Sequence, residues 1–237
     1  GEVYVTGNFL DANDLKEGDK LTITHGKNSV ELTIAGKAKE LGIELFVLDD
    51  GWFGERNDDF TSLGDWYPNL QKLPGGIAGL AKKIEAMGLK FGLWFEPEMV
   101  NKDSDLYRKH PDWILCAPGR TPSPSRNQYV LDFSRPEVVD YVYDLIEKLL
   151  SGAAISYIKW DMNRPFSETG APNLQNQKEL WFRHTNAVFE IVDTLKEEYP
   201  DVHFEACASG GGRTDFGALA HFDSVWPSDL SLIHISE

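Results

Sequence analysis

From about Lys37 onward, short apolar runs alternate with longer stretches of helical periodicity. The apolar runs have the length of buried strands, and the stretches between them carry apolar residues at helical spacing. Strands that alternate with helices pair in parallel, because each helix returns the chain to the same end of the sheet. The sequence therefore predicts an α/β domain with a parallel sheet, whose strands are expected at residues 44–48, 89–95, 155–160, 202–207 and 224–226.

Helices are expected between these strands. Residues 78–87 have helical spacing, and Gly88 is expected to end that helix. Ser134 and Glu137 fit a capping box, with Ser134 as the N-cap of the next helix and Glu137 three positions later. Residues 175–198 form the longest predicted helix.

The first 36 residues follow a different pattern. Residues 20–24 and 30–34 alternate apolar and polar side chains on either side of the turn-forming segment 25–29. This arrangement predicts a β-hairpin. Residues 1–36 are therefore expected to be a β-rich segment that precedes the α/β domain.

The charge of the chain excludes some classes of partner. The 237 residues include 38 acidic and 23 basic side chains, which gives a formal net charge of −15. A surface this acidic repels phosphate backbones and anionic lipid, so neither a nucleic-acid partner nor a membrane-surface role is expected. No apolar run approaches the roughly 20 residues of a membrane helix, and no signal peptide is visible. Cys116 and Cys207 are too few for a disulfide framework, so a cytoplasmic location is the expectation.

Polar residues gather directly after each predicted strand. Both (β/α) barrels and doubly wound sheets build their sites at this edge. Asp161 and Asp229 each follow a strand and lie near a tryptophan. In a partly desolvated cleft two carboxyl groups can differ in pKa, which gives the ionised nucleophile and the protonated acid of a glycosidase. The alternative is that each aspartate caps the helix that follows its strand.

Asp49 and Asp50 form a double acid after the strand at 44–48. Adjacent carboxylates can accept hydrogen bonds from neighbouring hydroxyl groups of a sugar, or they can bind a cation. A helix cap beside a surface charge is the alternative. The six histidines show no metal-binding grouping, so no metal site is predicted.

Lys159, Cys207 and the segment 209–213 are further candidates. Lys159 lies two residues before Asp161, so on a strand both side chains point the same way, and the ammonium group would keep the carboxylate ionised. An ordinary ion pair is the alternative. The glycines of 209–213 lack the spacing of a phosphate-binding loop and are expected to let the backbone approach a ligand. Cys207 has no partner cysteine or nearby histidine, which favours a buried pocket wall over a nucleophile.

At these residues the chain resembles the bacterial α-galactosidases of glycoside hydrolase family 36, from about Lys37 to Asp229. The two most specific blocks are LFVLDDGWFG at 45–54 and YIKWDMNR at 157–164. The other blocks follow in the family's order, and they are GDW at 64–66, GLWFEPEMV at 92–100, RNQ at 126–128, LD at 131–132, CASGGGR at 207–213 and VWPSD at 225–229.

The resemblance implies a (β/α)8 TIM-type barrel that hydrolyses terminal α-galactosides of the melibiose or raffinose type by a retaining double displacement. Asp161 resembles the nucleophile, and Asp229 resembles the acid that protonates the leaving oxygen and then activates water. Asp49 and Asp50 resemble the pair that binds the galactose O4 and O6 hydroxyls. No metal and no nicotinamide cofactor is implied. The remaining sugar contacts, by resemblance, are Trp94, Arg126, Lys159, Asn163, Cys207 and Gly210.

The chain departs from the family at both ends. About five of eight barrel strands are expected within residues 37–229, so the expected fold is an incomplete (β/α)8 barrel. The β-rich segment 1–36 is read as a chimeric or frameshifted join, and residues 230–237 (LSLIHISE) as an in-frame translation of a sequencing adapter. Alone, the chain is expected to be poorly soluble and inactive, whereas a full-length form is expected to be homo-oligomeric. Galactosyl transfer, as in the raffinose-synthase branch, and galactoside binding without catalysis are the alternatives to hydrolysis.

Overall fold

The structure is a computed structural model that describes residues 2–5, 14, 16, 19–25, 28–37 and 42–229, called below the described part of the chain. Its main element is a five-stranded sheet in which every neighbouring pair is parallel. Across the sheet the order is β10-β9-β8-β5-β4. The strands lie within the predicted stretches, which confirms the α/β class, and they are β4 (Leu45–Leu48), β5 (Lys90–Phe95), β8 (Tyr157–Trp160), β9 (His203–Ala206) and β10 (Ser224–Val225).

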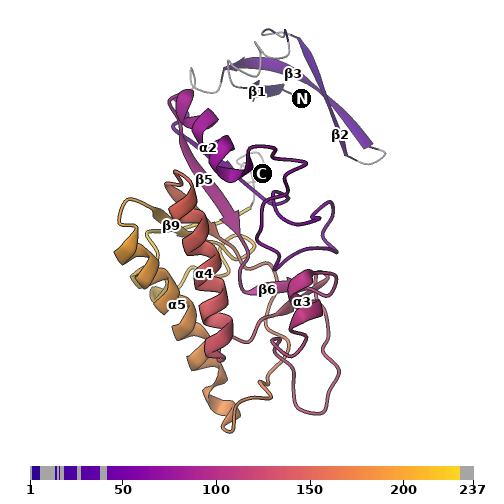
Figure 1. Cartoon of the computed structure of the whole chain (residues 1–237), viewed down its shortest axis with the longest axis vertical. Helices are drawn as coiled ribbons and strands as arrows, with labels where there is room; N and C mark the ends of the chain where they lie inside the picture. The colour runs from indigo at the N-terminus through magenta and orange to yellow at the C-terminus, as the bar shows by residue number, and fades with distance from the viewer. Residues whose placement is uncertain are drawn as a thin grey trace, which may run out of the picture.

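Helices connect these strands and cover one face of the sheet, with α4 and α5 side by side (Figure 1). The predicted helices at 78–87 and 175–198 are confirmed, and Gly88 takes the left-handed φ of +74° expected at a helix end. The helices between the strands are α2 (Gly76–Ala86), α4 (Pro136–Gly152), the 3-10 turn η2 (Gln177–Glu179), α5 (Leu180–Glu198) and α6 (Phe216–His221).

The connection between β5 and α4 contains a small substructure of its own. Its strands β6 (Met99–Asn101) and β7 (Gln128–Val130) form an antiparallel pair, and the short helix α3 (Asp105–Lys109) lies between them in the chain. Asp65 anchors α3, because its carboxylate accepts the backbone N–H groups of Asp105 and Leu106. None of the helices in the described part is long and apolar enough to cross a bilayer.

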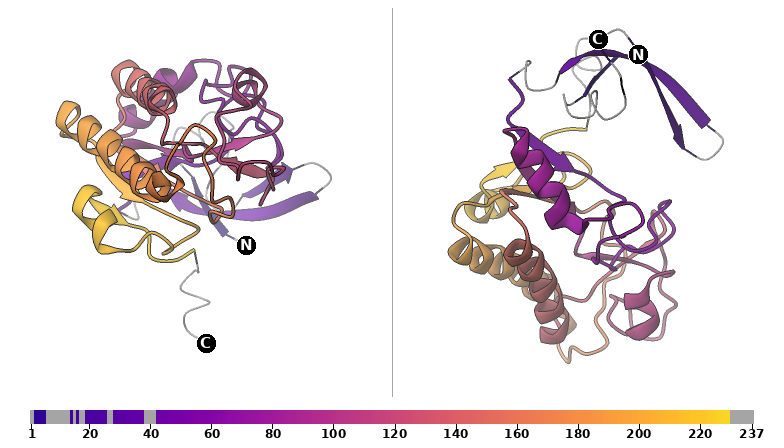
Figure 2. Two further views of the ribbon diagram at one scale, coloured as in Figure 1. Left: turned by 90° about the horizontal axis from the view of Figure 1, so that it is seen from below. Right: turned by 45° about the horizontal axis from the view of Figure 1, so that its top comes forward.

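The predicted hairpin is also present. Strands β2 (Lys20–His25) and β3 (Asn28–Lys37) are antiparallel, and β1 (Glu2–Val5) pairs with β3 in parallel. Pairing extends to His25 and Asn28, so the connection is shorter than the predicted segment 25–29. This sheet lies beyond the end of α2, away from α5 (Figures 1 and 2). Residues 230–237, which were interpreted as adapter sequence, lie outside the described part.

The start of α4 differs from the prediction. Its N-cap is Arg135, which makes no side-chain cap, and Pro136 follows at the first helical position. Ser134 Oγ instead donates to Asp132 Oδ1 at 2.5 Å, and the Glu137 carboxylate accepts from Arg135. Proline suits the first helical turn because that turn needs no N–H donor and its φ is already helical. The predicted capping box from Ser134 to Glu137 is therefore wrong.

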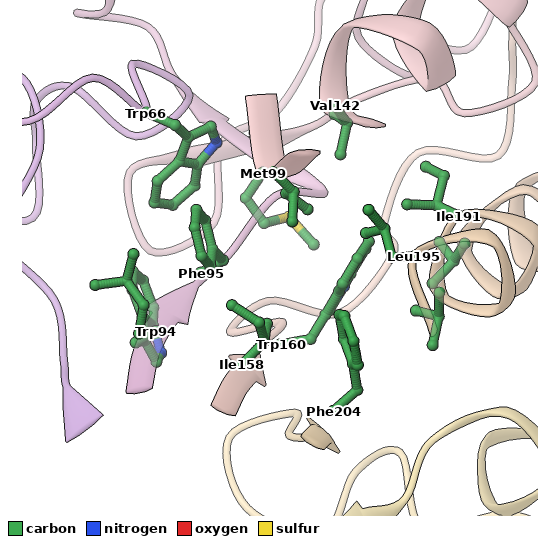
Figure 3. Packing of buried hydrophobic residues seen from close by; sticks show 14 of the residues in the cluster. Trp66, Trp94, Phe95, Met99, Val142, Ile158, Trp160, Ile191, Leu195 and Phe204 are labelled. Carbon is green, nitrogen blue, oxygen red and sulfur yellow. The ribbon is translucent and has the colours of Figure 1, made fainter. Parts of the chain in front are cut away.

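The two faces of the five-stranded sheet differ in polarity. Alternate residues of a strand point to opposite faces, and in β8 Ile158 and Trp160 are fully buried while Tyr157 and Lys159 are half-buried. Trp160 packs beside Phe204 of β9, facing the apolar side chains of α5 (Figure 3). The helix-covered face is thus the hydrophobic core, and the other face is left for polar side chains.

Candidate active site

The carboxyl ends of the strands carry most of the predicted site residues. Asp49 follows β4, Asp161 follows β8, and Cys207 follows β9. Trp94 of β5 and Lys159 of β8 are direct partners in the parallel register. Because register partners project from the same face, the two side chains lie together on the polar side of the sheet.

Asp161 is surrounded by hydrogen-bond donors. The residue is only 6% exposed. Its Oδ2 accepts from the indole Nε1 of Trp94 at 3.0 Å and from Asn163 Nδ2 at 2.7 Å. Its Oδ1 accepts from the backbone N–H of Met162 at 2.8 Å and from that of Ser209 at 3.4 Å. These donors fix the orientation of the carboxyl group and stabilise its charged form.

The net effect of this environment is to lower the pKa of Asp161. Burial raises that pKa, but hydrogen bonds from the Cys207 thiol, Trp94 and Asn163 more than offset the burial. Lys159 was predicted to keep Asp161 ionised. Its ammonium group instead pairs with Asp49, with Nζ 3.4 Å from Oδ2. The hydrogen-bond donors therefore do most of what the sequence analysis assigned to Lys159.

Cys207 is a buried wall of the site, as predicted. It is 2% exposed, and burial raises the pKa of its thiol to about 12. A raised pKa keeps the thiol protonated at neutral pH, which favours a hydrogen-bond donor to Asp161 over a nucleophile.

Each member of the double acid has a cation. The buried Arg56 donates Nε and Nη2 to the carboxylate of Asp50, at distances from 2.8 to 3.2 Å. Arg56 is itself fixed by Asn101 Oδ1 and by the carbonyl oxygen of Thr61. A two-pronged pair of this kind sets the orientation of a carboxylate while leaving lone pairs free to accept from hydroxyl groups.

The carboxylates of Asp49 and Asp50 are thus each paired with a cationic side chain. Across the described part, no group of three or more acidic, histidine or cysteine side chains is arranged to hold a metal. The carboxylates of Asp49 and Asp50 are hydrogen-bond acceptors beside the strand end, with 61% and 40% of their side chains exposed.

The glycine-rich loop lies between the two candidate catalytic acids. Ser209 contacts Asp161, and a Cβ on Gly210 would lie 3.1 Å from the backbone nitrogen of Asp229. A Cβ on Gly211 would lie 2.6 Å from the carbonyl oxygen of Pro227, a distance that real side chains do not adopt. The glycines were expected to admit a ligand. In the structure Gly210 and Gly211 also admit the 227–229 backbone, which brings Asp229 close to the loop.

Asp229 is exposed, in contrast to Asp161. Its Oδ1 accepts from the indole Nε1 of Trp226 at 2.8 Å. The Trp226 ring in turn lies under the ammonium group of Lys159, whose Nζ is 5.0 Å from the ring centroid. Asp229 is thereby linked through Trp226 and Lys159 to Asp49.

Arg126 contributes to the candidate site from the segment just before β7. Its Nη1 donates to the carbonyl oxygen of Asn163 at 3.0 Å and to Ser209 Oγ at 3.1 Å. Arg126 and Asn127 both have positive φ, at 51° and 62°. Such conformations are uncommon outside glycine and occur where the surrounding structure holds them. With Arg126, contacts connect all ten predicted site residues in one region.

Sequence reasoning gave no role to two buried glutamates that follow β5. Glu96 is 1% exposed, and Glu98 lies in a buried cluster with Arg213, His184 and Trp160. Burial alone would raise the pKa of Glu98, but the charge of Arg213 and the contacts with His184 lower it to about 2. Both glutamates stand in the block at 92–100, yet no pattern in that block distinguishes a buried carboxyl group from an exposed one.

Comparison with protein families matches residues 20–232 to Melibiase. The chain belongs to the Melibiase family. The Melibiase match includes all five strands of the parallel sheet and every candidate site residue.

Individual relatives of this Melibiase chain are α-galactosidases. Over 200 residues it is 51% identical to α-galactosidase AgaA of Geobacillus stearothermophilus, a match that covers 84% of this chain and 27% of that protein. The crystal structure of the α-galactosidase from Lactobacillus brevis superposes with a TM-score of 0.79 and 52% identity, over 81% of this chain and 26% of that one. A variant of AgaA in complex with raffinose gives a TM-score of 0.77 and 50% identity, over 80% and 27% of the two chains. The chain thus spans about a quarter of the length of these relatives.

Proposed function

We propose that this chain is part of the catalytic domain of an α-galactosidase, which removes terminal α-galactosyl residues from melibiose- or raffinose-type galactosides. The observation that carries the proposal is the environment of Asp161. A buried carboxylate with a lowered pKa and several hydrogen-bond donors lies at a strand end, with a second, exposed carboxylate across one loop. A retaining glycosidase needs one carboxyl group of each kind. The relative crystallised with raffinose supports the substrate class.

In the proposed reaction Asp161 is the nucleophile. Its Oδ atom forms a bond to the anomeric carbon as the bond from that carbon to the leaving oxygen breaks, and Asp229 gives its proton to the leaving oxygen. In the second step Asp229 takes a proton from water, whose oxygen displaces Asp161 from the anomeric carbon. The two inversions retain the configuration. The exposure of Asp229 fits its role, because water must reach it in the second step.

The sugar would be held by the polar groups around the two acids. Asp49 and Asp50 are proposed to accept hydrogen bonds from the galactose O4 and O6 hydroxyls, with Lys159 and Arg56 fixing their orientation. The other proposed sugar contacts are Trp94, Arg126, Lys159, Asn163, Cys207 and Gly210.

The sheet is proposed to be an arc of a (β/α)8 barrel. Its strands follow one another across the sheet in chain order, from β4 to β10, with no reversal. A doubly wound sheet reverses its strand order at the binding crevice, whereas a barrel keeps one direction throughout. The strand order therefore favours the barrel over the doubly wound alternative.

A graft tests the function in the context of a whole enzyme. Residues 42–229 would replace the matching segment of the Geobacillus stearothermophilus relative, and the product is called the graft below. We expect the graft to hydrolyse p-nitrophenyl α-D-galactopyranoside, and Asp161→Asn to lower its kcat by at least about 1,000-fold. A folded graft that binds galactose in calorimetry without turnover would refute hydrolysis and support a binding role. Transfer of galactose to an acceptor sugar in preference to water would support galactosyl transfer as the function.

A further inference from the structure

Glu96 is hydrogen-bonded to the loop that follows the candidate nucleophile. It follows the last residue of β5 and is 1% exposed. Its Oε1 accepts the backbone N–H of Asn163 at 2.5 Å, and its Oε2 accepts from Gln128 Nε2 at 3.1 Å. Glu96 acts on the loop 161–163, which follows the neighbouring strand β8.

Glu96 is connected to the candidate site through Asn163. The side-chain Nδ2 of Asn163 donates to Asp161 Oδ2 at 2.7 Å, and its Oδ1 accepts from Ser209 Oγ at 2.9 Å. Its carbonyl oxygen accepts from Arg126 at 3.0 Å. Asn163 therefore contacts the nucleophile, the glycine-rich loop and the Arg126 segment at once, and the Glu96 bond fixes its backbone.

We propose that Glu96 is a positioning residue, whose carboxyl group holds the 161–163 loop through Asn163 and so aims the Asp161 carboxylate. The proposal rests on the α-galactosidase function proposed above. A shift of about 1 Å in a reacting group can cost around 100-fold in rate, so a tether at this point affects turnover.

The surroundings of Glu96 raise the pKa of its carboxyl group. Burial raises the pKa of Glu96 to about 7, and the nearby charge of Asp161 acts in the same direction. The N–H bond from Asn163 and the charge of Arg126 oppose this change without cancelling it. Two adjacent carboxylates each resist ionisation, so the raised pKa of Glu96 leaves Asp161 as the more readily ionised member of the pair.

Two substitutions in the graft separate hydrogen bonding from charge. Glu96→Gln keeps an acceptor for the Asn163 N–H and carries no charge. Glu96→Leu has a similar size but removes the acceptor. Asp132→Asn is the matched control, because Asp132 is a fully buried carboxyl group whose side-chain hydrogen bonds and ion pair, among the described residues, are to Ser134 and Arg135. For each variant we would measure kcat, KM and the temperature at the midpoint of unfolding. We would also measure how kcat/KM falls as the pH is lowered, which is called the acid limb below.

We expect Glu96→Leu to lower kcat by about 100-fold, with KM within about threefold of the parent graft. Its acid limb should move to higher pH, because a loosened Asn163 no longer stabilises the Asp161 carboxylate. Glu96→Gln should restore kcat to within about threefold and leave the acid limb in place. Asp132→Asn should change neither kcat nor the acid limb.

Some results would overturn the proposal. If Glu96→Leu kept the parent's kcat and acid limb, the tether would have no role in turnover. If Glu96→Gln lost as much kcat as Glu96→Leu, or moved the acid limb downward, the carboxyl group would act through a negative charge. Turnover by the parent graft reports on the α-galactosidase function itself, so that function can fail independently of the comparison among variants.

Discussion

The hydrogen bond from Trp94 to Asp161 should set the pH at which the site loses activity in acid. The indole Nε1 of Trp94 lies 3.0 Å from Asp161 Oδ2, and both residues are buried. Trp94→Phe deletes this donor while keeping an aromatic ring beside Phe53 and Trp66, which Trp94 contacts in the parent. The carboxylate then keeps its bonds from Asn163 and from the backbone, but loses one of its donors.

The size of the effect follows from the energy of one such bond. A hydrogen bond to a charged group contributes about 1.5–3 kcal/mol, and one pKa unit corresponds to about 1.4 kcal/mol. Losing the donor destabilises the ionised form of Asp161 and raises its pKa. The acid limb of kcat/KM reports the pKa of the free enzyme. We therefore expect its midpoint in Trp94→Phe to rise by about one to two pH units.

Trp52→Phe is the control for this experiment. Trp52 is buried in the same aromatic cluster, and its Nε1 donates at 3.0 Å to the carbonyl oxygen of Trp94, not to Asp161. Trp52→Phe therefore removes the same ring volume and one indole donor as Trp94→Phe, but this donor does not bond to Asp161. Both variants would be assayed in the graft with a chromogenic α-galactoside across the acid range. If the two limbs coincided with the parent's, or moved together, the Trp94 donor would not control the ionisation of Asp161.

Three further substitutions in the graft have definite expected outcomes. Arg56→Met frees the Asp50 carboxylate, so KM for the galactoside should rise by about tenfold with a smaller change in kcat, and an unchanged KM would contradict the role of Arg56. Glu98→Gln should lower stability by about 3 kcal/mol at pH 7, measured by denaturant unfolding. Because the pKa of Glu98 is about 2, this difference should persist above pH 4.5 and shrink as pH falls toward 2; a difference independent of pH would contradict it. Gly210→Ala should lower kcat by at least about tenfold, since φ is +86° there and the new Cβ would press on the Asp229 backbone; kcat equal to the parent's would refute that contact.

Periodicity predicted the elements of the fold because each strand and helix is specified by its own residues. The run at 44–48 and the helix at 175–198 needed no information from elsewhere in the chain. The start of α4 was misplaced because two local signals compete there. The sequence around Ser134 predicts a helix cap. In the structure its hydroxyl group donates to Asp132, and Pro136 begins the first turn. Local pattern alone does not decide between such signals.

The candidate site could be predicted where a residue's place depends on a strand end, but not where it depends on side-chain partners. Asp161 was singled out because it follows β8, and Trp94 because of the family resemblance. The cation expected beside Asp161 belongs to Asp49 instead, since Lys159 Nζ reaches across to the end of β4. Arg56 and Glu96 were missed because their contacts, with Asp50 and with Asn163, follow from loops whose paths the sequence does not disclose.

The two candidate acids acquire different properties from one loop. Ser209, at its start, donates to the buried Asp161, and Gly210, one residue later, meets the backbone of the exposed Asp229. A side chain at Gly210 would push the second acid away without altering the donors of the first. Asn163 Oδ1 accepts from Ser209 Oγ, and the backbone N–H of Asn163 donates to Glu96. A substitution at Glu96 can therefore also displace the glycine-rich loop. Backbone packing at Gly210 and Gly211 therefore places Asp229, whereas hydrogen-bond donors from several segments stabilise the charge of Asp161, and Ser209 connects the two.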